Sequence, residues 1–275
     1  MNNHILNLFD LTSEITIVTG GLGQLGSNFV RVLTDAGARV AIVDIKDAAT
    51  PNIQTLLDEK RPIKIYKTDI IKKTEVEDVY KKIVADLGVP TILINNAGID
   101  NPPNSSPEMV GLFENYPEAA WDAVIDSHIK GAFLMSQEFF KHLVPAKKGG
   151  SIINISSTYG VVTPDQSIYE WRRRKGEVFY KPVAYSVAKS GMLNLTRWLA
   201  EYGGPHGIRA NTLVPGGVFN NQAPEFLAEY NKRTILGRMA QSDDYNAAIV
   251  FLASRQASGY MTGSTMTIDG GWTAR

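Results

Sequence analysis

The chain has 275 residues, no cysteine, and 28 basic (Lys+Arg) against 28 acidic (Asp+Glu) residues. This length suits one large domain, and the lack of cysteine excludes disulfides, thiolate metal sites and thiol nucleophiles. Balanced charge argues against a broad nucleic-acid-binding face. We see no signal-peptide pattern, and the longest apolar stretch, from Ala247, is too short to span a bilayer. We therefore expect a cytoplasmic location and no membrane partner.

Seven short β-branched runs alternate with segments of helical spacing along the chain. The runs are "ITIVTG" (15–20), "RVAIVD" (39–44), "IKIYKTD" (63–69), "TILINNAG" (91–98), "SIINISS" (151–157), "IRANTLVPG" (208–216) and "MTIDGG" (266–271). They are apolar almost throughout, as is typical of strands buried on both faces. The alternation predicts an α/β fold in which helices cover both faces of a parallel sheet.

Each run also ends in glycine, proline or a polar residue. In open α/β sheets, ligands bind at the carboxyl ends of the strands. We therefore expect these endings to gather at one edge of the sheet, although they are far apart in the sequence.

The first run leads into "TGGLGQLG" (19–26), in which Gly21, Gly23 and Gly26 fit the pattern G-x-G-x-x-G. Glycines allow the backbone to approach a pyrophosphate, and the helix that follows offers free N–H groups. A strand before the loop and a helix after it favour a dinucleotide site over a plain turn.

Asp44 ends the second run, about 20 residues further on, where a carboxylate binds the adenosine ribose and repels a 2′-phosphate. It favours NAD over NADP, although Lys46 lies nearby and Asp44 could be a solvated turn residue. Asp69, at the end of the third run, is a weaker candidate for the adenine end. It could instead cap a helix that starts near Lys72.

Tyr185 and Lys189, in "YSVAKSG", are four residues apart and so share one face of a helix. A nearby ammonium favours the phenolate and lowers the tyrosine pKa, which would make Tyr185 a proton donor or acceptor near neutral pH. The alternative is an ordinary amphipathic helix with a surface lysine. Upstream, "INISS" places Ser156 and Ser157 where a hydroxyl can bind a substrate oxygen.

Together, "TGGLGQLG", "NNAG", "NISS", "YSVAK", "PGG" and "IDGGW" resemble the short-chain dehydrogenase/reductase family over nearly the whole chain. The resemblance implies a single-domain, Rossmann-type doubly wound sheet of about seven strands. It also implies that Tyr185 is the general acid/base, that Ser157 rather than Ser156 is the catalytic serine, and that Lys189 binds the nicotinamide ribose. Val218 would meet the nicotinamide carboxamide, and a homodimer or homotetramer would form through the long helices.

The resemblance, together with the loop and acid described above, predicts a cofactor site for NAD, with NADP less favoured. Its predicted residues are Gly20, Gly23, Gln24, Leu25, Gly26, Asp44, Asp69, Ile70, Asn96, Ala97, Gly98, Tyr185, Lys189, Pro215, Gly216 and Val218.

The glycine loop departs from the family pattern, because Gln24 stands at the usual middle glycine position. The spacing of Gly20, Gly23 and Gly26 resembles the longer branch, which includes sugar-nucleotide epimerases and dehydratases. The other motifs and the chain length fit the shorter dehydrogenase branch, which we follow.

His128 is a second departure, because the family usually has an asparagine there that holds a water in a proton relay. A histidine can keep such a relay or can simply fill space and bond to the backbone. His4, His142 and His206 show no metal-ligand spacing, and we predict no metal site.

The third departure is an insertion, because Ser157 and Tyr185 lie 28 positions apart, roughly twice the usual spacing. The extra segment, residues 164–182, should border the substrate cleft, or else form a solvated loop or a subunit contact. Aromatic faces suit sugars and arginine forks suit phosphate or carboxylate. The residues in question are Tyr169, Trp171, Arg172, Arg173, Arg174, Lys175, Phe179 and Tyr180.

Two further segments complete the predicted cleft. The loop after "NNAG" could form the opposite wall, with Asp100 and Asn101 as possible substrate contacts, and residues 218–239 resemble the family's mobile lid. We therefore expect an oxidoreductase that moves a hydride between NAD(H) and a secondary alcohol or ketone, on a polar, sugar- or polyol-like substrate. The alternatives are an NAD-retaining sugar-nucleotide epimerase or dehydratase, and a non-catalytic dinucleotide-binding sensor.

Overall fold

The computed structural model describes residues 4–100 and 107–275. Its centre is one sheet of seven strands, all parallel, in the order β3-β2-β1-β4-β5-β6-β7. The predicted α/β fold with a doubly wound sheet is confirmed. The strands are β1 (Ile15–Thr19), β2 (Arg39–Asp44), β3 (Ile63–Lys67), β4 (Ile92–Asn95), β5 (Gly150–Ile155), β6 (Ile208–Pro215) and β7 (Thr265–Ile268).

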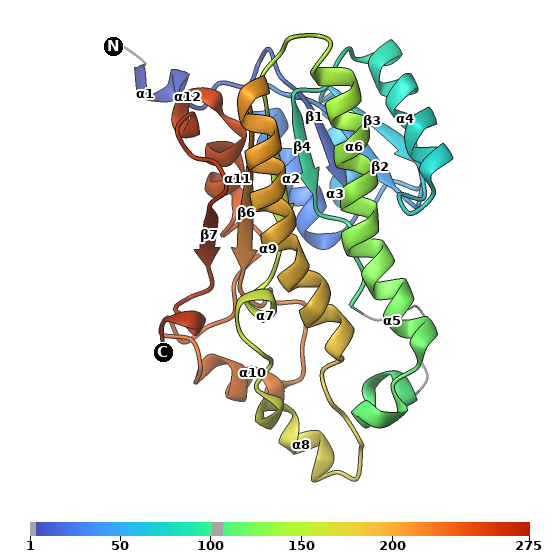
Figure 1. The fold of residues 1–275 in the computed structure, drawn as a ribbon. Helices are drawn as coiled ribbons and strands as arrows, with labels where there is room; N and C mark the ends of the chain where they lie inside the picture. The colour runs from blue at the N-terminus through green and yellow to red at the C-terminus, as the bar shows by residue number, and fades with distance from the viewer. Residues whose placement is uncertain (1–3, 101–106) are drawn as a thin grey trace.

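Helices cover both faces of the sheet (Figure 1). One face carries α4 (Lys73–Asp86), α6 (Gly131–Leu143) and α9 (Val183–Gly203). The other carries α2 (Gln24–Asp35), α3 (Pro51–Asp58) and α11 (Asn246–Ala253). The remaining helices are α1 (His4–Asn7), α5 (Glu118–Ile125), α7 (Thr158–Val161), α8 (Glu170–Arg173), α10 (Pro224–Asn231) and α12 (Arg255–Ser258). No helix within the described ranges is long and apolar enough to cross a bilayer.

Short helical turns complete the chain. A π-helical turn, η3 (Asp126–Lys130), joins α5 to α6. The 3₁₀ turns are η1 (Pro107–Val110), η2 (Phe113–Asn115), η4 (Gln166–Tyr169), η5 (Gly204–His206) and η6 (Trp272–Ala274).

The core has two layers because successive strand residues point to opposite faces of the sheet. Val18 and Ile94 belong to the layer under α2, while their neighbours Ile17 and Leu93 belong to the layer under α6. The central strand β1 is buried along its whole length, whereas the edge strands β3 and β7 are partly exposed. The apolar runs therefore predicted burial on both faces correctly for the interior strands only.

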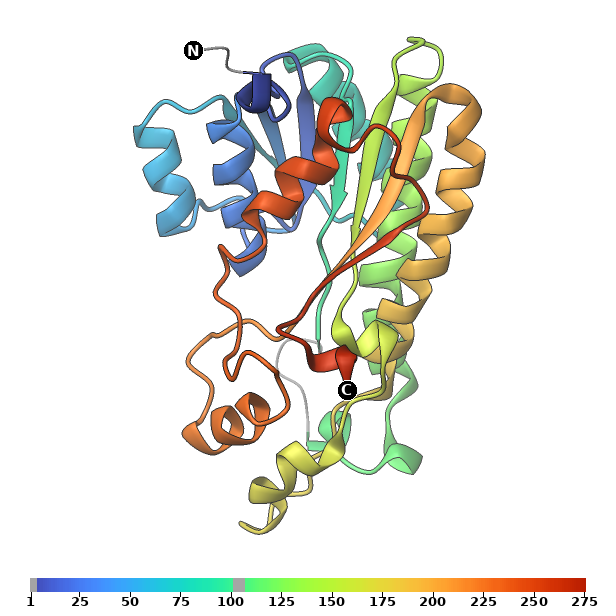
Figure 2. The same cartoon turned by 90° about the vertical axis from the view of Figure 1, so that its left-hand side faces the viewer.

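The segments that follow the strands gather at one end of the molecule. Figure 2 shows α10, the short helices before α9 and the C-terminal turn beyond the carboxyl ends of the strands, while the N-terminus lies at the opposite end. This arrangement places the loops that carry the predicted site residues around one cleft.

Candidate active site

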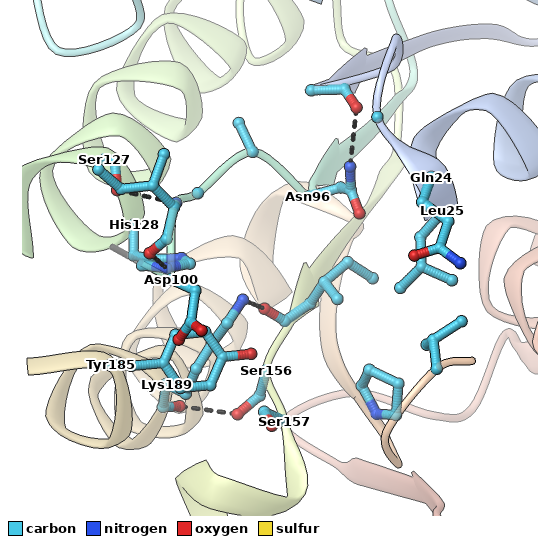
Figure 3. Close-up of a pocket in the computed structure, with 18 of the residues that line it drawn as sticks. Gln24, Leu25, Asn96, Asp100, Ser127, His128, Ser156, Ser157, Tyr185 and Lys189 are labelled. Carbon is cyan, nitrogen blue, oxygen red and sulfur yellow. Dashed lines mark hydrogen bonds between the residues drawn. The ribbon is translucent and has the colours of Figure 1, made fainter. Parts of the chain in front are cut away.

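The cleft has a volume of about 690 Å³ and opens at the carboxyl ends of the parallel strands. It is lined by the glycine loop, by residues that follow β2, β3, β4, β5 and β6, and by the start of α9. Figure 3 shows Gln24, Leu25 and Asn96 on one side of this cleft and the reactive side chains on the other. Every predicted catalytic or cofactor-binding residue except Gly26 lines it.

The glycine loop is a backbone cradle in which side chains do not fit. Gly20 has a φ of +63°, and a Cβ there would lie 2.8 Å from the Cα of Ala97. Gly23 is the N-cap of α2, so the helix begins at Gln24. Gly26 is buried, and a Cβ on it would collide with the carbonyl oxygen of Gly20. Gly26 therefore acts by letting the helix approach the strand, and it does not line the cleft.

The Gln24 departure from the family pattern has a structural consequence. Its side-chain Nε2 donates to the backbone carbonyl of Phe219 over 2.7 Å, so the start of α2 is joined to the segment that resembles a lid. A glycine at this position could not make that link.

The β4 loop is held against the glycine loop by its own backbone and amide groups. Asn96 Nδ2 donates to the carbonyl oxygens of Thr19 (3.0 Å) and Gly20 (3.1 Å). The Thr19 hydroxyl accepts from the backbone N–H groups of Asn96 (3.0 Å) and Ala97 (3.1 Å). These bonds fix the middle of the cleft floor between β1 and β4.

Asp44 lies in the cleft and its carboxylate is fixed by backbone donors. Oδ2 accepts from the N–H of Leu22 (3.0 Å) and Oδ1 from that of Lys46 (3.1 Å). Within residues 4–100 and 107–275 this carboxylate forms no ion pair. It is therefore a charged acceptor beside the glycine loop, where the sequence predicted one.

Asp69 lines the cleft but also organises its own turn. Its Oδ1 accepts from the N–H of Ile71 (3.3 Å), and its Oδ2 lies 3.5 Å from Lys72 Nζ. Its own N–H donates to Glu75 Oε2 at 2.8 Å. The N-cap of α4 is Lys72 and has no side-chain capping hydrogen bond, so the alternative that Asp69 caps this helix is wrong, and the adenine role stays a prediction.

Ser157, Tyr185 and Lys189 converge in the cleft, opposite the glycine loop (Figure 3). The Ser157 hydroxyl shares a hydrogen bond with the Tyr185 phenol. Lys189 is only 5% exposed, and its Nζ donates to the carbonyl of Ile155 at 2.9 Å and lies 5.7 Å from the centroid of the Tyr185 ring. The helical spacing of four residues thus brings the two side chains together.

Ser156 serves the structure and not the reacting centre. Its buried hydroxyl donates to the backbone carbonyl of Lys189 at 2.7 Å, which joins the end of β5 to α9. Of the two serines, only Ser157 therefore presents its hydroxyl to the phenol of Tyr185, in agreement with the preference drawn from the resemblance.

The electrostatics of the pair differ from the sequence expectation. Desolvation and then the charge of Asp100 raise the pKa of Tyr185 to about 12, against the lowering effect of the hydrogen bond with Ser157. Burial lowers the pKa of Lys189 to about 7, against a smaller raising effect of Asp100. The expected lowering of the Tyr185 pKa by Lys189 is wrong for the protein by itself, because desolvation and then Asp100 raise this pKa and the lysine is not among the groups that shift it.

His128 lies in the π-helical turn η3, and turns of this kind often mark functional sites. Its ring is 3% exposed and meets the Tyr185 ring edge to face at 5.7 Å. Nε2 is 3.1 Å from the carbonyl of Ile99, whereas Nδ1 is buried and has no hydrogen-bond partner among residues 4–100 and 107–275. Burial, and then the charge of Lys189, hold the pKa of His128 well below its usual range. This lowering favours the neutral imidazole, and the relay role stays a prediction.

Gly98 is required by this histidine, because a Cβ at position 98 would overlap the His128 ring. Among the described residues, no group of three or more acidic or histidine side chains could hold a metal.

The insertion borders the cleft through two residues only, Tyr169 and Lys181. The arginines of the insertion do not line the cleft, and they bond within the insertion. Arg172 pairs with Glu177 (2.6 Å), and Arg173 Nη2 pairs with Glu170 (2.9 Å). The mostly exposed Arg174 lies 3.9 Å from Glu170.

The insertion instead contacts the lid-like segment around α10. Arg233 pairs with Asp165 at 2.6 Å and donates to the Ser167 hydroxyl at 2.6 Å. Lys175 pairs with Glu225 at 2.7 Å. Two segments far apart in the sequence thus form one wall of the cleft.

Lys181 is the cleft residue that sequence reasoning did not single out. Its Nζ lies 4.8 Å from the centroid of the Tyr185 ring and forms an ion pair with Asp100, at 2.6 Å from Oδ1 and 2.5 Å from Oδ2. Helical spacing gave no signal for it, because residue 181 lies before α9 begins at Val183. Asp100 was a predicted substrate contact and does line the cleft, whereas Asn101 lies outside the described residues.

A family model described as enoyl-(acyl carrier protein) reductase matches residues 23–273. The 2-dehydro-3-deoxy-D-gluconate 5-dehydrogenase of Escherichia coli is 30% identical over 281 residues, which cover 98% of this chain and 100% of that protein.

Solved structures agree with this similarity. A short chain dehydrogenase from Leptospira borgpetersenii with bound NAD+ has a TM-score of 0.84 and 31% identity, covering 97% of this chain and 95% of that one. A gluconate 5-dehydrogenase from Burkholderia cenocepacia, in complex with NADP and tartrate, has a TM-score of 0.84 and 26% identity, covering 99% and 100%. The named activities and cofactors differ from one match to the next, so the matches agree on the fold and on oxidoreductase chemistry but not on one substrate.

Proposed function

This chain belongs to the short-chain dehydrogenase/reductase family, and we propose that it is an NAD-preferring enzyme that moves a hydride between the nicotinamide and the alcohol or ketone carbon of a polar, sugar- or polyol-like substrate. The observation that carries the proposal is the convergence of Ser157, Tyr185 and Lys189 beside a glycine cradle in one cleft.

The cleft fits a nicotinamide dinucleotide. The cradle around Gly20 leaves no room for a Cβ, as expected where a backbone approaches a pyrophosphate, and the N–H groups at the start of α2 are anion donors. Asp44 would hold the adenosine ribose, and the backbone of Asn96 to Gly98 would line the middle of the site. When bound, the nicotinamide supplies the hydride acceptor or donor.

The proton is handled by the protein's own side chains. In the oxidation direction Tyr185 Oη takes the proton of the substrate hydroxyl, and in reduction it returns that proton to the carbonyl oxygen. Ser157 Oγ holds the same substrate oxygen while its charge changes. Lys189 would bind the nicotinamide ribose, and because burial lowers its pKa to about 7, its charge can change near neutral pH.

The preference for NAD rests on Asp44, whose carboxylate would repel a 2′-phosphate. Initial rates with NAD(H) and NADP(H), followed by the absorbance of the reduced cofactor, test it. A tenfold preference for NADP(H), worth about 1.4 kcal/mol, would overturn the interpretation of Asp44.

The substrate class rests on the similarity to dehydrogenases of sugar acids and on the aromatic rings in the cleft, since aromatic faces suit sugar rings. Those lining rings are Tyr159, Tyr169, Phe226 and Tyr230. A panel of sugars, polyols and keto acids tests the proposal by cofactor absorbance. Tightly bound NAD without net turnover would favour an epimerase or dehydratase, as the glycine spacing suggests. Cofactor binding with no activity on the panel would favour a sensor.

A homo-oligomer is the proposed assembly. On α9, Trp198 and Tyr202 are 60% and 52% exposed and stack on each other at 5.3 Å, and Phe133 of α6 is 49% exposed. An apolar patch of this kind is typical of an interface. Light scattering of the purified protein tests it, and a monomer at micromolar concentration would contradict it.

A further inference from the structure

The substrate side of the cleft contains a lysine that the proposed reaction does not use. The lysines lining the cleft in residues 4–100 and 107–275 are Lys46, Lys181 and Lys189, and no arginine lines it there. Lys46 follows Asp44 on the cofactor side, and Lys189 is bonded to the carbonyl of Ile155. Lys181 is therefore the cation that a substrate could meet directly.

The fold of the insertion holds Lys181 in this position. The Gln166 amide bonds both sides of its backbone, because Oε1 accepts from the Lys181 N–H at 2.9 Å and Nε2 donates to its carbonyl at 3.2 Å. Arg173 in turn donates to the carbonyls of Gln166 (2.8 Å) and Phe179 (3.0 Å). The polar groups of the insertion thus fix the backbone of residue 181 directly before α9 and Tyr185.

The ion pair between Lys181 and Asp100 is asymmetric. The lysine side chain is 14% exposed, whereas that of Asp100 is 50% exposed. A half-exposed carboxylate regains water easily when it leaves an ion pair, while a largely buried ammonium without an anion keeps its desolvation cost. The site therefore requires an anion at Lys181 but does not require that this anion be Asp100.

We propose that Lys181 binds a carboxylate of the substrate in exchange for that of Asp100, so that the enzyme acts on sugar-like hydroxy or keto acids. This inference rests on the proposed function, since it names the substrate class of the same site. A carboxylate at Lys181 lies directly beside Tyr185, because the ammonium is 4.8 Å from that ring. The carboxylate thus anchors one end of the substrate next to the phenol that handles its proton.

The carboxylates of Asp100 and of the substrate compete for Lys181, and this competition predicts opposite effects of two mutations. Asp100 occupies Lys181 and also repels an incoming carboxylate, so it weakens the binding of acids. Removal of its charge should tighten acid binding, whereas removal of the Lys181 charge should weaken it. A purely structural ion pair would give no such opposite effects.

The test is calorimetric binding to the full-length protein saturated with NADH. The ligands are D-gluconate, D-galactonate and D-xylonate, each paired with the alditol of the same configuration, so that each pair differs only by a carboxylate. We expect at least one aldonate to bind more tightly than its alditol, and Lys181→Met to weaken that aldonate by about 30-fold relative to the alditol. Asp100→Asn should tighten the aldonate, and Lys181→Arg should retain much of the preference.

The matched control is Lys175→Met, which removes an exposed lysine of the same insertion that pairs with Glu225 outside the cleft. It should leave the ratio of aldonate to alditol affinity unchanged. NADH binding reports whether each variant is folded, and if Lys181→Met fails this check, Lys181→Gln and Asp100→Asn still decide.

An unchanged ratio in the Lys181 variants, or no aldonate that binds more tightly than its alditol, would overturn the inference. Failure of the proposed function looks different. Suppose that acids bind with a preference that depends on Lys181 but that no hydride transfer occurs with any of them. This result would contradict the proposed dehydrogenase activity and would still support the carboxylate site.

Discussion

The two sides of the cleft are built in different ways. On the cofactor side, backbone groups and glycines make the surface, as at Gly20 against Ala97 and Asp44 against the N–H of Leu22. On the substrate side, charged side chains from distant segments make it, as in the pair of Asp100 and Lys181, which are 81 positions apart. A backbone site constrains neighbouring residue types and so leaves a motif, whereas a side-chain pair across the fold leaves none.

The two sides also differ in how firmly they are held. The Asn96 amide is tied to two backbone carbonyls of the glycine loop. By contrast, the pairs that link the insertion to α10 include half-exposed carboxylates on Asp165 and Glu225. Exposed ion pairs contribute little, about 0–1 kcal/mol each, so the substrate side can rearrange at low cost.

Tyr185, where the two sides meet, should give the largest effect. Tyr185→Phe removes the proton donor and acceptor, so we expect turnover to fall by about 10²–10⁴-fold. NADH binding, measured by fluorescence, should be largely intact, because the cofactor side does not depend on the phenol. The control is Tyr180→Phe, a tyrosine of the insertion outside the cleft. Undiminished turnover in the Tyr185 variant would contradict the proposed role of Tyr185 in proton transfer.

The cofactor side should resist even one added methyl group. In Gly26→Ala the new Cβ meets the Gly20 carbonyl, backbone against backbone, which should cost about 1–3 kcal/mol. We expect a lower melting temperature and weaker NADH binding, by calorimetry. Gly204→Ala is the matched control, because its Cβ would enter open space and its φ is −51°. Equal behaviour of the two variants would show that the cradle tolerates side chains.

A mutation on the substrate side should weaken substrate binding without affecting cofactor binding. Arg233→Ala removes the contacts to Asp165 and Ser167 that join the insertion to the lid-like segment. If the lost ion pair contributes ~1 kcal/mol to substrate binding, the substrate KM should rise about fivefold. The Kd for NADH should not change. Lys232→Ala, which removes a more exposed neighbour that pairs with Glu229, is the control. A matching rise in the Kd for NADH would show that the two sides of the cleft do not bind their ligands independently.

The smallest effect should be a shift in pH dependence. The charge of Asp100 raises the pKa of Tyr185, because a negative neighbour disfavours the phenolate. Asp100→Asn should therefore lower the apparent pKa in the pH profile of alcohol oxidation, so that activity appears at lower pH. Asp47→Asn, an exposed aspartate paired with Lys67, should leave the profile unchanged. A shift to higher pH would contradict the electrostatic assignment.

Much of the fold was predictable because strands and helices are local patterns. The apolar runs located all seven strands, and the step of four residues placed Tyr185 and Lys189 on one side of α9. The partial exposure of the edge strands β3 and β7 was not predicted, because an apolar run does not show which strand lacks a neighbour on one side. Their partial exposure follows from strand order, which the runs alone do not carry.

The site was predictable to a different degree on its two sides. The glycine loop, Asp44 and the "NNAG" residues were located by motif, and all but Gly26 of the predicted cofactor residues line the cleft. The sequence left open whether the insertion borders the cleft or forms a solvated loop or a subunit contact, and in the structure Tyr169 and Lys181 line the cleft whereas its arginines do not. Its arginines Arg172 and Arg173 form ion pairs with glutamates of the insertion, and these pairs depend on how the insertion folds.

By itself, the sequence determined the parallel sheet, the glycine cradle and the cluster of serine, tyrosine and lysine to which we assign the reaction. These features follow from hydrophobic periodicity and from residue types at short, fixed spacings. Only the tertiary structure decided that Lys181 faces Tyr185 with Asp100 as its anion, and that desolvation raises the phenol pKa where the lysine was expected to lower it. Solvent exclusion and long-range charge contacts arise only when distant segments pack together, so no local pattern can encode them.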